Sequence, residues 1–315
     1  MTQTATGPVR FRVVGMEDGM MLRQLLGKRL RLPPAAASEI VRAGGAYVGQ
    51  IRICVPTQRV SEGERVTVYP QAAKIAAVEP AALHLLHRDD NCVIVDKPHG
   101  VPAAATKAAN RGTLAQALVS RLTQEGVLRP YVGLVHELTA AASGLALYTI
   151  RSQATGSFFK EFAALPIQRG YRVRLRGSFP GDTSMCAAEV VQLPAGGGWR
   201  LAREGDREPI AARTEFRKLA EVGEETLATV DLGDSPSQAI RLHAAALGLP
   251  IVGDGEPDST LCLLAETLAF TQPRTGAAIL VRATLPAWAA LAGEASAPGP
   301  GSGDESSDAF DDAPG

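Results

Sequence analysis

The 315-residue chain lacks long apolar runs and a secretory leader. No segment approaches the roughly 18 consecutive apolar residues that a membrane-spanning helix needs, so no membrane partner is predicted. The first residues, MTQTATGPVR, have no basic region followed by an apolar core, which indicates that a secretory signal is absent. We therefore expect a cytoplasmic protein.

Cysteine is also scarce, and the usual site motifs are missing. The five histidines include no HExxH pair and no cysteine partner at metal spacing, so no metal site is predicted. No Walker loop, GxSxG elbow or GxGxxG turn is present. The cysteines lie far apart in apolar surroundings, which favours buried free thiols over disulfides. They are Cys54, Cys92, Cys186 and Cys262.

The net charge of −1 hides an asymmetry along the chain. Residues 293–315 carry six acids and no base, so the rest of the chain has 32 bases against 27 acids. This tail is rich in Gly, Ser, Pro and acid, a composition that predicts disorder. It is either a solubilising end or an acidic arm that competes with nucleic acid for the basic body.

Residues 10–70 form a first predicted unit with its own helices and strands. Its helices carry the basic residues Arg23, Lys28 and Arg29, which form either a solvated surface or a phosphate-binding face. The predicted elements are a strand at 11–14, helices at 20–30 and 35–43, and strands at 46–48 and 65–69.

Residues 83–292 form a larger predicted unit in which strands and helices alternate without a regular βαβ rhythm, which favours an α+β fold. In the strand at 169–176 the residues alternate, placing Tyr171 on an apolar face and Arg172, Arg174 and Arg176 on the other. The remaining predicted elements are strands at 92–96, 145–150, 226–232 and 278–283, and helices at 113–122, 153–162 and 237–247, with Thr113 as an N-cap.

Five short segments follow one order along this unit: VDKPHGVP, HELTAAASG, FKEFAALPIQRGYRVRLRG, AIRLHAAALGLPIVGD and LAFTQPRTG. Each is weak alone, but together they resemble the RluA-type RNA pseudouridine synthases over about residues 85–291. The earlier segments RAGGAYV and RVSEGERVTVY are similar to the small, ribosomal-protein-like RNA-binding module that often precedes that domain. The resemblance implies a central, largely antiparallel sheet with flanking helices.

The family isomerises uridine in RNA after flipping the base out of its stack. The resemblance implies that an aspartate acts at the ribose, in a loop of the form H-R-L-D-x-x-T-S-G, without a metal or organic cofactor. His136, Leu138, Ser143 and Gly144 match this loop, but Thr139 stands in place of the aspartate.

This difference has a chemical consequence. An aspartate is ionised at neutral pH because its reference pKa is about 3.9, whereas a threonine hydroxyl needs an adjacent base to act as a nucleophile. Glu137 is a neighbour, but adjacent side chains on an extended loop point to opposite sides. By analogy with hydrolases, losing a covalent nucleophile costs on the order of 10⁶ in rate. We therefore expect Thr139 to be non-functional as a catalytic residue.

A second motif, R-T-H-Q-I-R-x-H in the family, reads PSQAIRLH here: the first arginine, the first histidine and the glutamine are replaced, and the final arginine is kept as Arg241. That arginine pairs with the catalytic aspartate in the family. The resemblance also makes Tyr171 the residue that stacks on uracil, places Arg169 where the family has lysine, and adds His136 to the substrate pocket. From the residues alone, Tyr171 is a core tyrosine and His136 a structural histidine.

Three hypotheses remain open. The chain is an RNA-binding member of the family with impaired catalysis, an active synthase with a displaced carboxylate such as Asp96 or Glu137, or a structural or protein-interaction domain that has lost RNA binding. The first predicts a monomer that binds ribosomal or transfer RNA and not DNA. Its predicted RNA-binding residues are Arg23, Lys28, Arg29, Arg172, Arg174 and Arg176.

Overall fold

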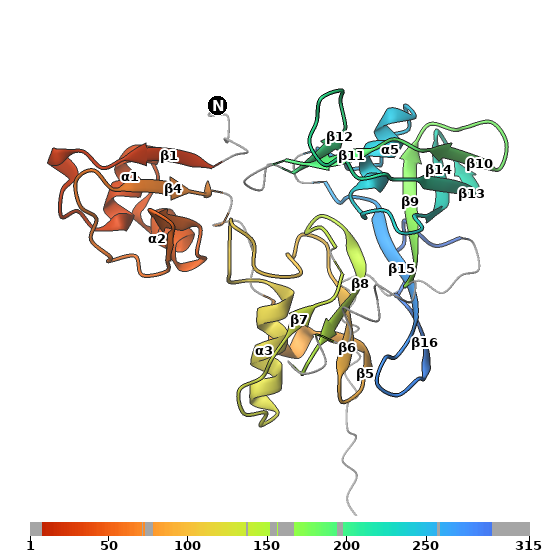
Figure 1. Cartoon of the computed structure of the whole chain (residues 1–315), viewed down its shortest axis with the longest axis horizontal. Coiled ribbons are helices and arrows are strands. Elements are labelled where there is room, and N and C mark those ends of the chain that lie inside the picture. Colours follow the sequence, from red (N-terminus) through yellow and green to blue (C-terminus); the bar gives the residue numbers. More distant parts are fainter. Residues whose placement is uncertain are drawn as a thin grey trace, which may run out of the picture.

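The described residues of the computed structural model form three β-sheets, of four, ten and two strands, the smallest being the pair β11-β12 (Figure 1). The structure describes residues 8–70, 72, 78–136, 138–151, 156, 167–193, 198–256 and 259–291. The predicted tail at 293–315 lies outside these residues, as does nearly all of the predicted helix at 153–162. Among the described residues, no helix has the length and apolar character that crossing a bilayer requires.

The N-terminal unit is a four-stranded antiparallel sheet in the order β1-β4-β2-β3, with two helices packed on one face. Pro34 begins the second helix, a position where its missing N–H costs nothing. The elements are β1 (Val9–Arg12), the 3-10 turn η1 (Gly15–Glu17), α1 (Leu22–Leu30), α2 (Pro34–Arg42), β2 (Ala46–Val48), β3 (Ile51–Ile53) and β4 (Arg65–Val68). All the predicted elements of this unit are present, and β3 is an additional strand.

The larger unit is built on a ten-stranded sheet in the order β10-β13-β14-β9-β15-β8-β6-β5, with β16 beside β15 and β7 beside β8. Every pairing is antiparallel except that of β8 with β15. The elements are η3 (Pro80–Ala82), β5 (His84–Arg88), β6 (Cys92–Lys97), α3 (Leu114–Gln124), β7 (Gly133–Leu134), β8 (Ser143–Thr149), β9 (Gln168–Arg176), β10 (Thr183–Cys186), β11 (Val190–Gln192), β12 (Trp199–Leu201), β13 (Thr214–Val222), β14 (Glu225–Asp231), α5 (Ala239–Ala246), β15 (Leu263–Thr271) and β16 (Ala278–Arg282).

The α+β architecture with a largely antiparallel sheet that was predicted from the sequence is confirmed. Tyr171, Val173 and Leu175 of β9 all point into one hydrophobic cluster, beneath α5, as the alternation predicts. The hydroxyl of Thr113 accepts a hydrogen bond from the Gln116 amide at 3.2 Å, so the predicted cap of α3 is also present. All four cysteines are free.

Candidate functional site

The loop between β7 and β8 carries the matched motif, and its apolar residues anchor it in the core. Leu138 and Ala142 are buried in the same cluster as Tyr171. The Thr139 hydroxyl accepts a hydrogen bond from the Ala142 amide at 3.3 Å, closing a tight turn. Within the described part of the chain, neither a carboxylate nor an imidazole hydrogen-bonds to this hydroxyl. Glu137 lies outside the described residues. Among the described residues, therefore, no base is placed to activate the Thr139 hydroxyl.

A buried lysine fastens this loop to the turn that follows β6. Lys97 is fully buried, and its ammonium group donates to the carbonyls of Pro98 at 3.0 Å, Val101 at 2.9 Å and Ala140 at 3.0 Å. Burial lowers the pKa of Lys97 to about 7, while the charge of Asp96 opposes that shift. The sequence indicated this segment, VDKPHGVP, only as part of the family resemblance and gave Lys97 no role of its own. The sequence feature that could have revealed this role is a lysine at the end of a strand of apolar residues.

Gly144 is required where the loop enters β8. Its φ is +102°, and an added Cβ would lie 2.3 Å from the Ala265 carbonyl oxygen, because β8 and β15 run side by side here. His136, at the other end of the loop, accepts a hydrogen bond from the Leu147 amide through Nε2 at 3.4 Å. Both residues thus serve the packing of β8, whatever chemistry the loop performs.

Tyr171 and Arg169 lie two positions apart on β9, and Arg169 lies beside the turn that precedes the second motif. Tyr171 is 1% exposed, and its hydroxyl has no hydrogen-bond partner among the described residues. Burial raises the pKa of this hydroxyl, and the neighbouring Arg169 guanidinium opposes the rise. Arg169 donates to the carbonyls of Gly233 at 3.2 Å and Ser235 at 3.1 Å. Arg169 therefore ties β9 to that turn.

Arg241 of α5 has a carboxylate partner that the sequence did not reveal. Its Nε donates to one oxygen of Asp254 at 3.0 Å, and a terminal nitrogen binds the other oxygen, giving a two-point ion pair. The Asp254 side chain is 19% exposed and the Arg241 side chain 36%. The arginine that pairs with the catalytic aspartate in the resembled family is thus bound here by the last residue of GLPIVGD. Asp96, the other candidate carboxylate, lies near His84 instead, 4.0 Å away.

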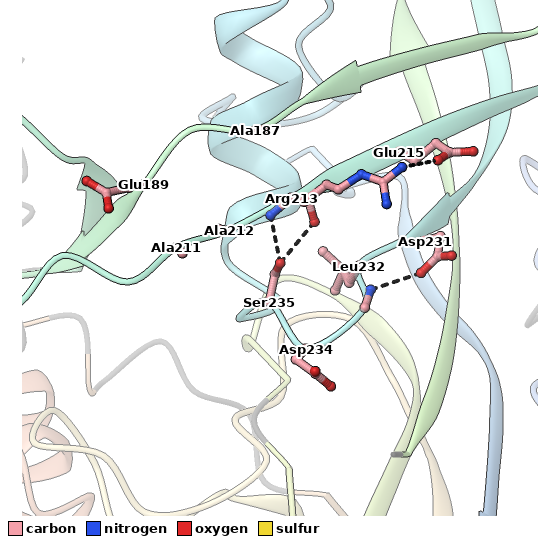
Figure 2. Close-up of a pocket in the computed structure, with 11 residues that line it drawn as sticks. Ala187, Glu189, Ala211, Ala212, Arg213, Glu215, Asp231, Leu232, Asp234 and Ser235 are labelled. Atoms are coloured by element: carbon pink, nitrogen blue, oxygen red, sulfur yellow. Dashed lines mark hydrogen bonds and ion pairs between the residues drawn. The ribbon is translucent and has the colours of Figure 1, made fainter.

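Two hollows flank the turn at 232–235, and acidic side chains dominate their walls. One has a volume of about 540 Å³, and Figure 2 shows Glu189, Glu215, Asp231 and Asp234 around it with Arg213. Arg213 is already paired with Glu215 at 2.7 Å. The second hollow, of about 390 Å³, shares the two aspartates and includes Arg169. This distribution of charge disfavours contact with phosphates on this side of the domain.

The six predicted RNA-binding residues do not form one free basic surface. The prediction that Arg172 lies on an exposed face was wrong, because its side chain is 7% exposed and bound to Glu266 at 2.6 Å. The other partners are Glu225 for Arg174 at 3.2 Å, Glu256 for Arg176, Glu17 for Arg29 at 2.8 Å and for Lys28 at 3.8 Å, and the Met21 sulfur for Arg23 at 3.8 Å.

One cluster in the described ranges has donor atoms close enough for a metal ion: His87, Asp89 and Cys92, within 4.8 Å of one another. Asp89 already accepts hydrogen bonds from the amides of Asn91 and Cys92 and from the Gln272 side chain. Burial raises the pKa of the Cys92 thiol far above its usual range. These contacts account for Asp89 and Cys92 as parts of a hydrogen-bonded turn, with His87 Nε2 3.7 Å from the Asp89 carboxylate.

Comparison with known proteins gives a consistent set of relatives, although no protein-family model matches the chain. The chain is 25% identical over 224 residues to an uncharacterized RNA pseudouridine synthase of Aquifex aeolicus, covering 69% of each protein. It is 27% identical to the uncharacterized RNA pseudouridine synthase YlyB of Bacillus subtilis, covering 72% of this chain and 78% of that protein. It is 25% identical to ribosomal large subunit pseudouridine synthase C of Escherichia coli, covering 90% and 95%.

Solved structures agree on the fold. Human RNA pseudouridylate synthase domain containing 1 superposes with a TM-score of 0.54 at 19% identity, covering 66% of this chain and 85% of the human chain. The human domain-containing-4 protein gives a TM-score of 0.52 at 16% identity, covering 65% and 89%.

Proposed function

Because the chain belongs to the RluA-type RNA pseudouridine synthase family, we propose that it binds RNA but does not isomerise uridine at an appreciable rate. The observation that carries this proposal is Thr139 at the position of the family's aspartate, with its hydroxyl bonded to a backbone amide. The rest of the loop keeps its place through Lys97 and Gly144, so the fold that receives RNA in the family persists without the reactive group.

The protonation state of a threonine hydroxyl favours inactivity. A threonine hydroxyl is almost entirely protonated at neutral pH, and no described base accepts its proton. By analogy with hydrolases that lose their nucleophile, we expect a rate on the order of 10⁶ below that of an intact enzyme. Binding of RNA needs only cations and a base platform, and neither depends on the lost carboxylate.

The test uses the full chain with ribosomal and transfer RNA transcripts that carry tritium at uridine C5, because isomerisation at C5 releases that tritium. We expect salt-dependent RNA binding and no tritium release above background. Release by the wild-type protein would refute the proposed inactivity. Absence of binding to any transcript would leave only a structural or protein-interaction role.

A second candidate function has one specific observation in its favour. Asp254 is held by Arg241 in a two-point ion pair, and a carboxylate so placed is a candidate for the displaced nucleophile. If the wild-type protein releases tritium, Asp254→Asn should abolish release while Thr139→Ala leaves it intact. The opposite pattern would assign the residual chemistry to the threonine.

A further inference from the structure

The outer face of the N-terminal sheet carries a row of side chains directed away from the helices. Val66, Val68 and Ala46 point into the helical core, so the alternate residues point outward. The register pairs Arg10 with Thr67, Thr67 with Tyr47, and Tyr47 with Arg52, which places these four residues in a line across all four strands. Arg12 and Arg65 form a second pair beside this line.

All of these side chains except Arg52 line a hollow of about 730 Å³, a volume within the range of ligand-binding pockets. Four cations line it, Arg10, Arg12, Arg65 and Lys107, and none of its described lining residues is acidic. Two tyrosines, Tyr47 and Tyr69, complete the wall, with their rings edge to face and 6.0 Å apart. We call Arg10, Arg12, Arg65 and Lys107 the sheet-face cations.

No acidic side chain in the described part of the protein neutralises the sheet-face cations. No described carboxylate lies within ion-pair distance of any of them, and the Arg12 guanidinium donates only to a backbone carbonyl, that of Gly63, at 3.1 Å. The helical face of the same unit differs, because Glu17 binds both Arg29 and Lys28. The sheet therefore carries a group of cations without carboxylate partners, whereas among the described cations of α1 and α2 only Arg23 lacks one.

The larger unit closes one side of the hollow and fixes its position. Lys107 comes from the segment before α3, and its carbonyl accepts a hydrogen bond from the Tyr47 hydroxyl at 3.0 Å. The Arg52 guanidinium donates to the Thr106 carbonyl at 2.5 Å and lies 5.1 Å from the Tyr47 ring centre. The Asn110 amide donates to the Ala43 carbonyl at 2.9 Å. The hollow is therefore shared by both units.

We propose that this face binds a single-stranded RNA segment, with its phosphates on the sheet-face cations and its bases toward the two tyrosines. Rows of cations across adjacent strands match a chain of phosphates, whereas a small anion would need the cations to converge on one point. Aromatic side chains beside such cations are typical of surfaces that bind single strands. The proposal rests on the proposed RNA-binding function and names the surface that performs it.

The experiment measures binding of the full chain to a fluorescent single-stranded RNA 15-mer between 50 and 300 mM salt. The test variant is Arg10→Ala/Arg12→Ala/Arg65→Ala. The matched control is Arg23→Ala/Lys28→Ala/Arg42→Ala, which removes the same charge from the helical face. We expect the sheet variant to lose roughly 10- to 100-fold in affinity at low salt and its log–log salt slope to fall by about 2, since each phosphate contact contributes about 0.7. The helical control should bind nearly as the wild-type protein does.

Three results would distinguish failure of this binding surface from failure of the proposed RNA binding. If both variants lose the same affinity, only net charge matters, and the sheet face is not the site. If the sheet variant keeps the wild-type slope, the proposal is wrong while RNA binding stands. If the wild-type protein binds no RNA at any salt, the proposed function fails together with this surface. Unchanged circular dichroism and urea midpoints verify that the variants fold, and their exposed strand positions favour that outcome.

Discussion

Replacing Lys97 by methionine should remove a pH dependence of stability that the wild-type protein has above neutral pH. Burial lowers the pKa of Lys97 in the folded protein to about 7, from 10.5 in the unfolded chain. Between these values the unfolded chain binds more protons than the folded protein, so the free energy of unfolding rises with pH. This contribution is absent below about pH 7 and complete above about pH 10.5.

The size of the effect follows from one proton. The slope approaches about 1.4 kcal/mol per pH unit, so the free energy of unfolding should rise by roughly 2.5 kcal/mol between pH 7.5 and 9.5. Urea titrations of wild type and Lys97→Met at each pH provide the assay, because other titrating groups cancel in the difference. Lys107→Met, at an exposed lysine, is the matched control and should leave the pH dependence unchanged.

A difference between wild type and Lys97→Met that stays constant from pH 7 to 9.5 would refute this reasoning. It would mean that the three carbonyl acceptors hold the ammonium charged throughout, and that their hydrogen bonds outweigh the cost of burial. Lys97 would then remain charged and hold the loop through its three hydrogen bonds to backbone carbonyls.

Three further changes have defined outcomes. Gly144→Ala should cost more than about 3 kcal/mol of stability in urea unfolding, because the added methyl group meets a backbone carbonyl. The control Gly126→Ala, in open space at a similar φ, should cost about 1 kcal/mol. Equal losses in the two variants would show that the contact with β15 does not set the cost at Gly144. Asp254→Asn, which removes the carboxylate partner of the half-exposed Arg241, should lower the free energy of unfolding by at most about 1 kcal/mol, and a larger loss would indicate a wider network. Removing residues 293–315, with their six acids, should tighten RNA binding severalfold at 50 mM salt and little at 300 mM, and a salt-independent change would exclude electrostatic competition.

Local patterns predicted the elements of this fold well, and long-range pairing limited what they could say about the site. Alternation on β9 placed Tyr171 correctly, and a threonine before an apolar helical run predicted the cap of α3. The same alternation put Arg172 on a solvated face, because the sequence does not show that Glu266 lies beside it, 94 residues further on. The state of a charge depends on its neighbours in space, so a list of arginines did not identify the free ones.

The sheet-face cations also could not be recognised from the sequence, because they meet only through strand pairing. Arg10 and Arg65 lie 55 positions apart in the printed sequence, and only the register of β1 with β4 brings their strands together. The loop segment that supplies Lys107 belongs to the other unit. Sequence reasoning favoured the helices because basic residues cluster there along the chain. Clustering along the chain and the absence of a carboxylate partner are different properties, and the second decides which face attracts an anion.

The motif loop keeps its frame for reasons that do not require catalysis. Gly144 is fixed by the approach of β15, the Ala140 carbonyl is bound by Lys97, and Leu138 and Ala142 fill the core. Thr139 is different, because its hydroxyl makes only the turn-closing bond to the Ala142 amide, and an aspartate oxygen can accept the same bond. Exchange of aspartate for threonine therefore leaves the turn intact and removes only the reactive group. A matched frame is evidence for the fold, and the proposed loss of activity depends on Thr139, whose side chain the fold constrains least.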